Sequence, residues 1–211
     1  MKASTRVRTT AYIVIGAYSV VFLVYGISLP HAAGKVLGFL PTVLALLFGA
    51  YDTYAWHWGP LLRLARQPYL VGTWHGELTS YRRDDDGVPI DSTHEVFFVI
   101  RQTLTTISIT MISAESKSRS AAAQVVQHQA QDFSVQYQYQ NEPRLEFRQA
   151  GSATHTGGSS IELGGLRPMT LTGEYWTARE TRGTYQASRV GKDLVNTFDE
   201  GQRMVRETWE I

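Results

Sequence analysis

The chain has 211 residues, with 20 Lys and Arg, 19 Asp and Glu, and no Cys. Without Cys it can form no disulfide, no thiolate metal site and no Cys nucleophile. Residues 69–211 hold 14 basic and 18 acidic side chains. This acidic balance argues against a protein that binds DNA or RNA nonspecifically, because such proteins carry a basic surface. Residues 9–30 and 36–51 contain no charged side chain, so a single soluble domain is not expected.

The first apolar run, Thr9–Leu29, is long enough to cross a membrane. Its 21 residues would form a helix of about 31 Å, close to the roughly 30 Å hydrocarbon thickness of a bilayer. Lys2, Arg6 and Arg8 precede it, as in a signal peptide. The run exceeds the usual apolar length of such a peptide, however, so we expect a retained span.

The second apolar run, Val36–Trp58, predicts a second span. It contains Asp52 and ends in Trp56-His57-Trp58, residue types that favour the membrane interface. Asp52 would lie near the edge of the hydrocarbon, either as a polar contact between protomers or as an interfacial carboxylate. Basic residues flank the hairpin at both ends. We therefore expect residues 1–68 to form a hairpin with both termini cytoplasmic, and residues 69–211 to form a cytoplasmic domain.

Small side chains recur every three or four residues along the second span, at Gly34, Gly38, Thr42, Ala45, Gly49 and Asp52. Such a stripe lets another helix backbone approach closely. The sequence leaves two partners open, the first helix of the same hairpin or the hairpin of a neighbouring molecule.

From residue 69 onward the apolar pattern has a period of two, which predicts a domain that is nearly all β. Phe133, Val135, Tyr137 and Tyr139 alternate with polar side chains, for example, so that one face of that strand is apolar. The expected strands lie at about 70–82, 93–102, 104–113, 121–128, 132–140, 144–149, 159–164, 169–177 and 182–189. We expect a closed up-and-down, lipocalin-like β-barrel of about eight strands. A β-sandwich is the alternative.

Gly72-Thr73-Trp74 is similar to the Gly-x-Trp that opens lipocalin barrels. This similarity implies that the Trp74 indole packs across the closed end of the barrel. It also implies that an Arg from a late strand, such as Arg189, stacks on the indole.

No enzyme motif is present, since the sequence lacks a nucleotide-binding Gly-rich loop before a helix, His-Glu-x-x-His and Gly-x-Ser-x-Gly. We therefore expect no catalytic residue, no metal and no cofactor. His94, His128 and His155 lie on separate segments and are interpreted as surface or hydrogen-bonding residues. Asp84–Asp86 is interpreted as a solvated turn, because the alternate-position acids of a calcium loop are missing.

The densest polar and aromatic cluster lies between Gly173 and Thr184. In a strand, Tyr175, Thr177 and Arg179 would share one face. A guanidinium binds phosphate through charge-assisted hydrogen bonds, and an aromatic ring stacks on a base, so this face suits a nucleotide. The alternative is a surface strand whose Arg pairs with a neighbouring Glu. Ser116–Ser120 is a second candidate for phosphate contacts, or a plain polar loop.

The order of the motifs is more informative than any one of them. Two spans are followed by Gly-Thr-Trp-x-Gly, Val-Ile-Arg-Gln102-Thr, Ser-x-Ser-Arg-Ser, Tyr-Gln-Tyr139, His155-x-Gly and Leu171-x-Gly-x-Tyr175-Trp-Thr-x-Arg179. This arrangement resembles the SMODS-associating two-transmembrane, β-strand-rich effector family, the membrane effectors of bacterial CBASS anti-phage systems, over almost the whole chain.

The resemblance implies that the barrel binds a cyclic dinucleotide, the activating ligand, made by a partner nucleotidyltransferase after phage infection. Binding would drive oligomerisation of the hairpins in the bacterial inner membrane and loss of membrane integrity. Candidate ligand contacts are Tyr175, Thr177, Arg179, Arg182, Gln102, Arg119, Tyr139 and His155. Candidate membrane contacts are Gly38, Thr42, Ala45, Gly49 and Asp52. The rival interpretations are a membrane-anchored lipocalin-like barrel for a lipid or other apolar molecule, and a scaffold protein without a ligand.

Overall fold

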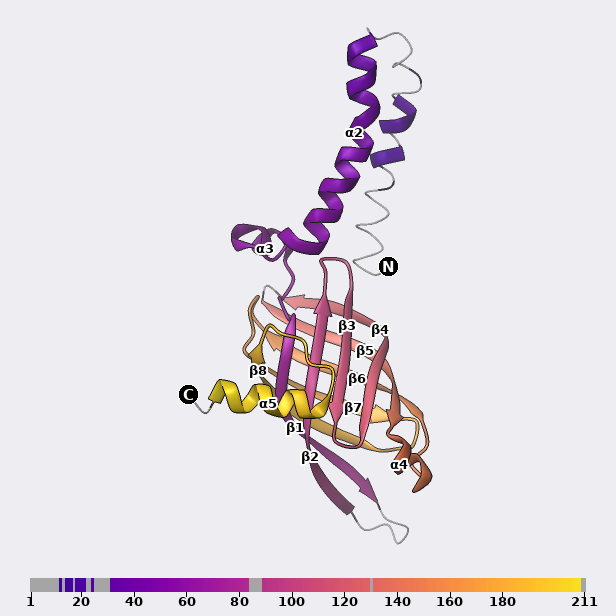
Figure 1. Ribbon diagram of the computed structural model, residues 1–211, viewed down its shortest axis with the longest axis vertical. Coiled ribbons are helices and arrows are strands. Elements are labelled where there is room, and N and C mark those ends of the chain that lie inside the picture. Colours follow the sequence, from indigo (N-terminus) through magenta and orange to yellow (C-terminus); the bar gives the residue numbers. More distant parts are fainter. Residues whose placement is uncertain are drawn as a thin grey trace. The chain divides into compact units, whose positions relative to one another are not determined.

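The computed structural model describes residues 12, 14–16, 18–21, 24, 31–83, 89–129 and 131–209. The chain divides into two compact units (Figure 1). The first comprises Met1–Ala65 and the loop Thr103–Thr106, and the second comprises Arg66–Gln102 and Ile107–Ile211.

The first unit is helical in its described part. Helix α2 (His31–Ala50) continues into the π-helical turn η2 (Tyr51–Ala55), and α3 (Gly59–Ala65) follows. The expected second span, 36–58, falls on α2, η2 and the turn after it, whereas most of the expected first span, 9–29, lies outside the described residues. In the part of the chain that the structure describes, no helix meets the length and apolarity required of a membrane span. The two-span anchor stays a prediction.

Asp52 has hydrogen-bond partners inside the first unit. Its carboxylate accepts a hydrogen bond from the backbone N–H of Thr105 at 2.9 Å and another from the Thr103 hydroxyl at 3.4 Å. Its backbone carbonyl accepts the N–H of Leu104 at 3.0 Å. Both sequence interpretations of Asp52 missed this role, because the partners lie about 50 residues away along the chain.

The second unit is a closed eight-stranded barrel (Figure 1). Each strand pairs antiparallel with the next, and β1 pairs with β8. This result confirms the expected closed up-and-down barrel and excludes the β-sandwich. The strands are β1 (Gly72–Arg83), β2 (Pro89–Gln102), β3 (Ile107–Ser113), β4 (Ser116–Gln129), β5 (Asp132–Pro143), β6 (His155–Gly164), β7 (Thr170–Thr177) and β8 (Arg182–Gly191).

Two local predictions were wrong. The expected strand at 144–149 is the short helix α4 (Leu145–Gln149). Leu145 and Phe147 alternate with charged residues there, and a run this short does not separate helix from strand by its period. Ser116–Ser120, expected to connect two strands, forms the beginning of β4.

Helix α5 (Phe198–Trp209) was not predicted and packs on the outside of the barrel. Its sequence carries a start signal similar to a capping box. Thr197 Oγ1 accepts the N–H of Glu200 at 3.2 Å, and the Glu200 carboxylate accepts the N–H of Asn196 at 2.7 Å. Phe198 packs edge-on against the outward-facing Phe97 of β2, with ring centroids 5.4 Å apart.

The inward-facing side chains change from apolar to polar along the barrel. On β5, Phe133 and Val135 are fully buried at one end of the interior, and Tyr137, Tyr139 and Asn141 follow on the same face towards the other end. The other strands repeat this gradient. The apolar end is filled by Trp74, Phe98, Ile100, Ile109, Phe133, Val135, Ile161, Leu163 and Leu171.

Trp74 closes the filled end of the barrel. It is fully buried, and its indole N–H donates to the carbonyl of Leu70 at 3.0 Å. The guanidinium carbon of Arg189 lies 5.6 Å from the Trp74 ring centroid and 5.1 Å from that of Tyr69. This geometry confirms the expected tryptophan plug with its stacked arginine. Gly72 precedes the plug at φ 139°, where a Cβ would collide with the carbonyl of Gly191.

Candidate ligand-binding cup

The polar end of the barrel holds a cavity of about 220 Å³. We call it the cup. All eight strands contribute to its wall, as do the β3–β4 and β7–β8 turns. Its lining residues are Leu78, Ser80, His94, Val96, Met111, Ser113, Glu115, Ser116, Ser118, Tyr137, Tyr139, Asn141, His155, Tyr175, Thr177, Arg179, Thr181 and Tyr185.

Three of the four cup tyrosines lie directly opposite a glycine on a neighbouring strand. Tyr139 pairs with Gly157 across β5 and β6, and Tyr185 pairs with Gly173 across β7 and β8. Tyr175 pairs in the same way with Gly183. A Cβ on any of these glycines would lie about 2.5–2.6 Å from ring atoms of its tyrosine.

The glycines therefore let the phenol rings lie close against the barrel wall. Such cross-strand pairs of an aromatic residue with a glycine also stabilise the sheet, because the ring covers the backbone that glycine leaves open. A larger side chain at any of the three positions would collide with its tyrosine and with a backbone carbonyl of a neighbouring strand, that of Trp176, Ser160 or Thr79.

Hydroxyl groups form a hydrogen-bonded floor. The Ser159 hydroxyl lies 2.6 Å from the Tyr185 hydroxyl and donates to the carbonyl of Glu174 at 2.8 Å. Higher in the wall, the hydroxyls of Ser80 and Tyr175 lie 2.5 Å apart. These bonds fix the orientation of the rings, since a buried hydroxyl without a partner is costly.

The cup phenols stay protonated over the physiological range. Burial raises the pKa of the Tyr137, Tyr139, Tyr175 and Tyr185 hydroxyls above the ordinary value for tyrosine. For Tyr139 the proximity of Tyr137 and Tyr175 raises the pKa further. Tyr139 and Tyr175 can therefore donate a hydrogen bond to a ligand, whereas the Tyr185 proton goes to Ser159, whose own proton goes to the Glu174 carbonyl.

A buried pair formed by a hydroxyl and a side-chain amide adds a hydrogen-bond donor to the wall of the cup. Ser118 and Asn141 are 4% and 8% exposed, and the Ser118 hydroxyl donates to Asn141 Oδ1 at 2.7 Å. The Asn141 oxygen accepts this hydrogen bond, and the amide nitrogen is the group of Asn141 that can donate to a ligand.

A positively charged side chain, that of Arg179, lies at the mouth of the cup. Arg179 donates to the carbonyl of Ala153 at 2.5 Å, and His155 Nδ1 lies 3.2 Å from the same oxygen. Burial lowers the pKa of His155 most, the bond to Ala153 opposes this, and the nearby Arg179 guanidinium lowers it further. The histidine is therefore neutral near pH 7 and the guanidinium supplies the positive charge.

The structure brings together five of the eight predicted ligand contacts. Tyr139, His155, Tyr175, Thr177 and Arg179 all line the cup. The alternation places Tyr175 and Thr177 on one face of β7, and Arg179 follows in the β7–β8 turn.

The other three predicted contacts lie elsewhere. Gln102 binds the segment that leads into β1, donating to the carbonyl of Pro68 and accepting the N–H of Leu70, both at 2.9 Å. Arg119 faces outward and pairs with Glu142 at 2.5 Å. Arg182 is exposed on the outer face of β8. These three side chains do not line the cup, because sequence order does not show which face of a strand turns inward. Their role as ligand contacts stays a prediction.

Sequence reasoning missed the deeper part of the cup. Tyr137, Tyr185 and Asn141 are buried polar groups whose convergence depends on strand register. The glycines at 157, 173 and 183 were the available signal, because isolated glycines within strands mark a close approach of another group. Of the three histidines, His94 and His155 line the cup. Among the described residues, no three metal-ligating side chains gather.

An eight-stranded barrel with one filled end and one hydroxyl-lined cup is typical of barrels that hold one small ligand. The chain belongs to the family of the Cap15 cyclic dinucleotide receptor domain, whose model matches residues 65–189. A curated relative, CD-NTase-associated protein 15 of Staphylococcus schleiferi, is 23% identical over 155 residues, which cover 74% of this chain and 79% of the relative. A redesigned β-barrel matches with a TM-score of 0.37 and 14% identity, over 57% of this chain and 90% of its own.

Proposed function

We propose that this chain is an effector of a bacterial CBASS anti-phage system and that a cyclic dinucleotide binds in the cup as its activating ligand. The cup carries this proposal, because a chain of the Cap15 receptor family presents neutral phenols, serine hydroxyls and one guanidinium around a single cavity. A partner nucleotidyltransferase would supply the ligand, and no catalytic step by this chain is required.

The cup chemistry suits a ligand with two phosphodiesters. Arg179 at the mouth offers charge-assisted hydrogen bonds to a phosphate oxygen. Tyr139 and Tyr175 offer ring faces on which a base stacks, and protonated hydroxyls that donate without carrying a charge. Asn141 can donate to an acceptor on a base edge.

An apolar ligand fits this interior less well. Trp74, Phe98, Phe133 and Ile161 already fill the apolar end. The cavity that remains is lined by hydroxyl, amide and charged groups together with Leu78, Val96, Met111 and the tyrosine rings. Burying hydrocarbon there would leave these polar groups without partners, which costs free energy.

Calorimetric titration of the purified full chain tests the proposal. We expect heat from at least one member of a panel of cyclic dinucleotides and none from a fatty acid of similar size. Heat from the fatty acid alone would replace the effector by a lipid carrier. No heat from either would leave the scaffold interpretation as the better one.

The membrane part of the proposal concerns the first unit. The predicted spans at 9–29 and 36–58 would anchor the chain in the bacterial inner membrane, with both termini and the barrel in the cytoplasm. The exposed apolar side chains of α2 support this proposal, with Val43, Leu44, Leu46 and Leu47 between 39% and 69% exposed. Such a surface is unusual for a helix in water.

Ligand binding would then promote oligomerisation of the hairpins and disrupt the membrane. A ligand can shift such an equilibrium only by its difference in affinity for the two states, and moving it from 1:99 to 99:1 needs roughly 5.5 kcal/mol. Thr42, Ala45 and Gly49 lie on the small-residue stripe and are exposed on α2. With Gly38 and Asp52 they are the proposed membrane contacts.

Leakage from vesicles that contain the full chain tests this step. Gly49→Leu adds bulk on the stripe, where no atom of the described residues lies within 4 Å of the position of a new Cβ, and we expect it to abolish ligand-dependent leakage while ligand binding persists. Leu47→Phe, on the opposite face of the helix, is the matched control and should leak as the wild type does. Equal leakage from both variants would remove the stripe from the mechanism.

A further inference from the structure

In the described part of the second unit, no helix packs over one wall of the barrel. Helix α5 covers outward-facing residues of β2 and β3, including Phe97, Val99 and Ile112. The outer faces of β6, β7, β8 and the middle of β1 surround an open hollow of about 540 Å³. We call this surface the bare wall.

A row of large side chains crosses the bare wall next to the cup mouth. Tyr81 lies directly opposite Arg182, and Arg182 lies opposite Trp176. Trp176 is 53% exposed and Tyr81 41% exposed. The indole lies over Gly158, since a Cβ on this glycine would be 2.6 Å from indole atoms. Trp, Tyr and Arg are the residue types that contribute most binding energy at protein interfaces.

The hollow below this row carries negative charge. Glu77, Glu162 and Glu174 line it together with threonine, serine and glutamine side chains. All three glutamates are exposed. Within the described residues, none of the three forms an ion pair with a Lys or Arg. A partner that fits here must bring positive charge.

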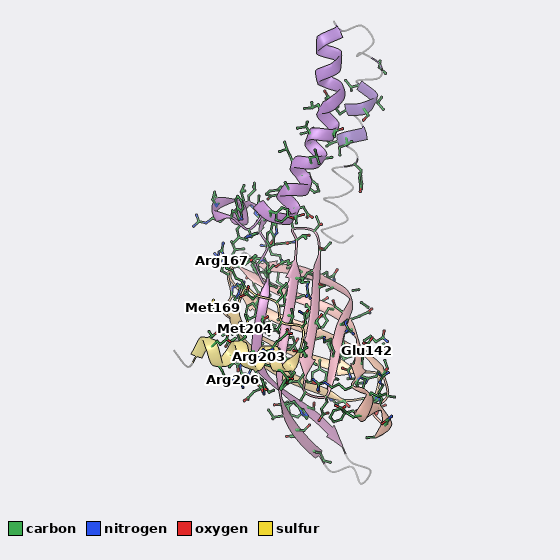
Figure 2. The ribbon with its side chains drawn as sticks, in the orientation of Figure 1. Glu142, Arg167, Met169, Arg203, Met204 and Arg206 are labelled. Atoms are coloured by element: carbon green, nitrogen blue, oxygen red, sulfur yellow. The ribbon has the colours of Figure 1, made fainter. Side chains whose placement is uncertain are left out.

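The same chain presents that charge on its α5 helix. Figure 2 shows Arg203 and Arg206 near Met204 and Met169 along one flank of the second unit. The two arginines are exposed, and Met169 is 64% exposed. In the described part of the chain neither arginine has an acidic partner. Three residues apart on a helix, they point to the same side.

The spacing of the charges agrees. Glu162 and Glu174 are diagonal neighbours on adjacent strands, since Glu162 pairs with Thr172 and Glu174 with Ser160. Diagonal neighbours in a sheet lie about 7–8 Å apart, and Cβ atoms three residues apart on a helix lie about 5–6 Å apart. Two long arginine side chains can therefore reach the two carboxylates together.

We propose that the bare wall binds a second copy of this chain, with Arg203 and Arg206 of that copy on Glu162 and Glu174 and apolar contact at Trp176. The contact joins two barrels side by side and involves neither the cup nor the first unit. It goes beyond the proposed function and does not depend on the identity of the ligand.

Strand β7 links this contact to the cup. Tyr175 and Thr177 face the cup, whereas Glu174 and Trp176 face outward on the bare wall. The two sets of side chains alternate on one backbone, so the contact lies on a strand that also lines the cup.

Charge reversal of the full chain, purified in detergent, tests the contact by sedimentation velocity over a concentration series. We expect Glu162→Arg with Glu174→Arg to weaken self-association about tenfold or more, and Arg203→Glu with Arg206→Glu to do the same. All four changes in one chain should restore it. Ser108→Arg, on the exposed outer face of β3 on the opposite wall, is the control and should associate as the wild type does.

Three outcomes would overturn the proposal: a wild type that stays monomeric at every concentration, reversed variants that associate normally, or a fourfold variant that fails to recover. Circular dichroism confirms that each variant is folded. Because the chain has no Cys, crosslinking gives a second measurement. A short bis-maleimide should join a Glu174→Cys chain to an Arg206→Cys chain and leave a Ser108→Cys chain unjoined. Ligand titration of the same variants tests the proposed function separately, since all of them keep the cup residues.

Discussion

The two ends of the barrel use the same eight strands for different purposes. At the filled end, the side chains of Trp74, Phe98, Phe133 and Ile161 are buried. The charged group there, the guanidinium of Arg189, stacks on the Trp74 ring. At the cup, the same inward positions carry phenols, hydroxyls and an amide around open space. Stability and ligand binding are therefore separated along the barrel axis. Substitutions at the filled end should lower stability, and substitutions in the cup should lower ligand affinity.

Loss of the tryptophan plug should give the largest effect, and it should affect stability. Trp74→Ala removes a fully buried indole and its hydrogen bond to Leu70. We expect a loss of about 3–5 kcal/mol in the free energy of unfolding, measured by urea denaturation. Trp176→Ala removes an indole that is 53% exposed and should change stability by much less. An equal loss in both variants would contradict the assignment of stability to the filled end.

Removal of the cup guanidinium should affect binding without affecting stability. Arg179→Ala deletes an exposed side chain that holds one carbonyl, and charge-assisted hydrogen bonds contribute about 1.5–3 kcal/mol. We expect affinity for a cyclic dinucleotide to fall about 10- to 100-fold with an unchanged melting temperature. Arg182→Ala, three residues along the chain but outside the cup, is the matched control for ligand affinity. An equal loss of affinity in both would place the ligand outside the cup.

Displacement of one phenol should have a smaller effect on binding. In Gly157→Ala, the new methyl group would meet the Tyr139 ring at 2.5 Å and also the backbone carbonyl of Trp176, so both the ring and the β6–β7 pairing must shift. We expect about a tenfold loss of affinity. The control is Gly164→Ala, at a strand position where no atom lies within 4 Å of the new Cβ, and it should bind normally. Wild-type affinity in Gly157→Ala would contradict the placement of the ligand against this wall.

Alkaline pH should produce the smallest effect. Burial raises the pKa of Tyr137 and Tyr185 in the folded state, so above a pH of about 10 the unfolded chain loses protons that the folded chain retains. Stability from these groups is full below that pH and declines above it. Melting temperatures between about pH 9 and 11 should fall less steeply in Tyr185→Phe than in the wild type. Equal slopes for the variant and the wild type would mean that the Tyr185 hydroxyl ionises as readily in the folded chain as in the unfolded chain.

Much of the barrel could be predicted from the sequence, because its alternation is regular. The period of two over Phe133–Tyr139 and the Gly72-x-Trp74 motif were sufficient for a closed barrel with a plugged end. The short segment 144–149 was not predictable in this way, since its alternation fits a helix as well as a strand. Helix α5 begins at a capping signal, Thr197, which is a local side-chain pattern and not a period of two.

The side chains that line the cup could be predicted where they come from one strand, but not where their convergence depends on several strands. Tyr175 and Thr177 followed from the alternation within β7. Arg182 was misplaced because the turn before it, with Glu180 at φ 63°, ends that alternation. Tyr185 and Asn141 depend on the register of other strands, which no local pattern specifies.

The pairing of β1 with β8 also limits how barrels can gather at high local concentration. In a closed barrel, backbone amides and carbonyls are hydrogen-bonded to neighbouring strands of the same chain, so the body of the barrel has few unpaired backbone groups to which another strand could add. Crowded copies then meet through side chains, whose contacts are reversible and sensitive to salt, and so remain far from the cross-β route to insoluble fibres.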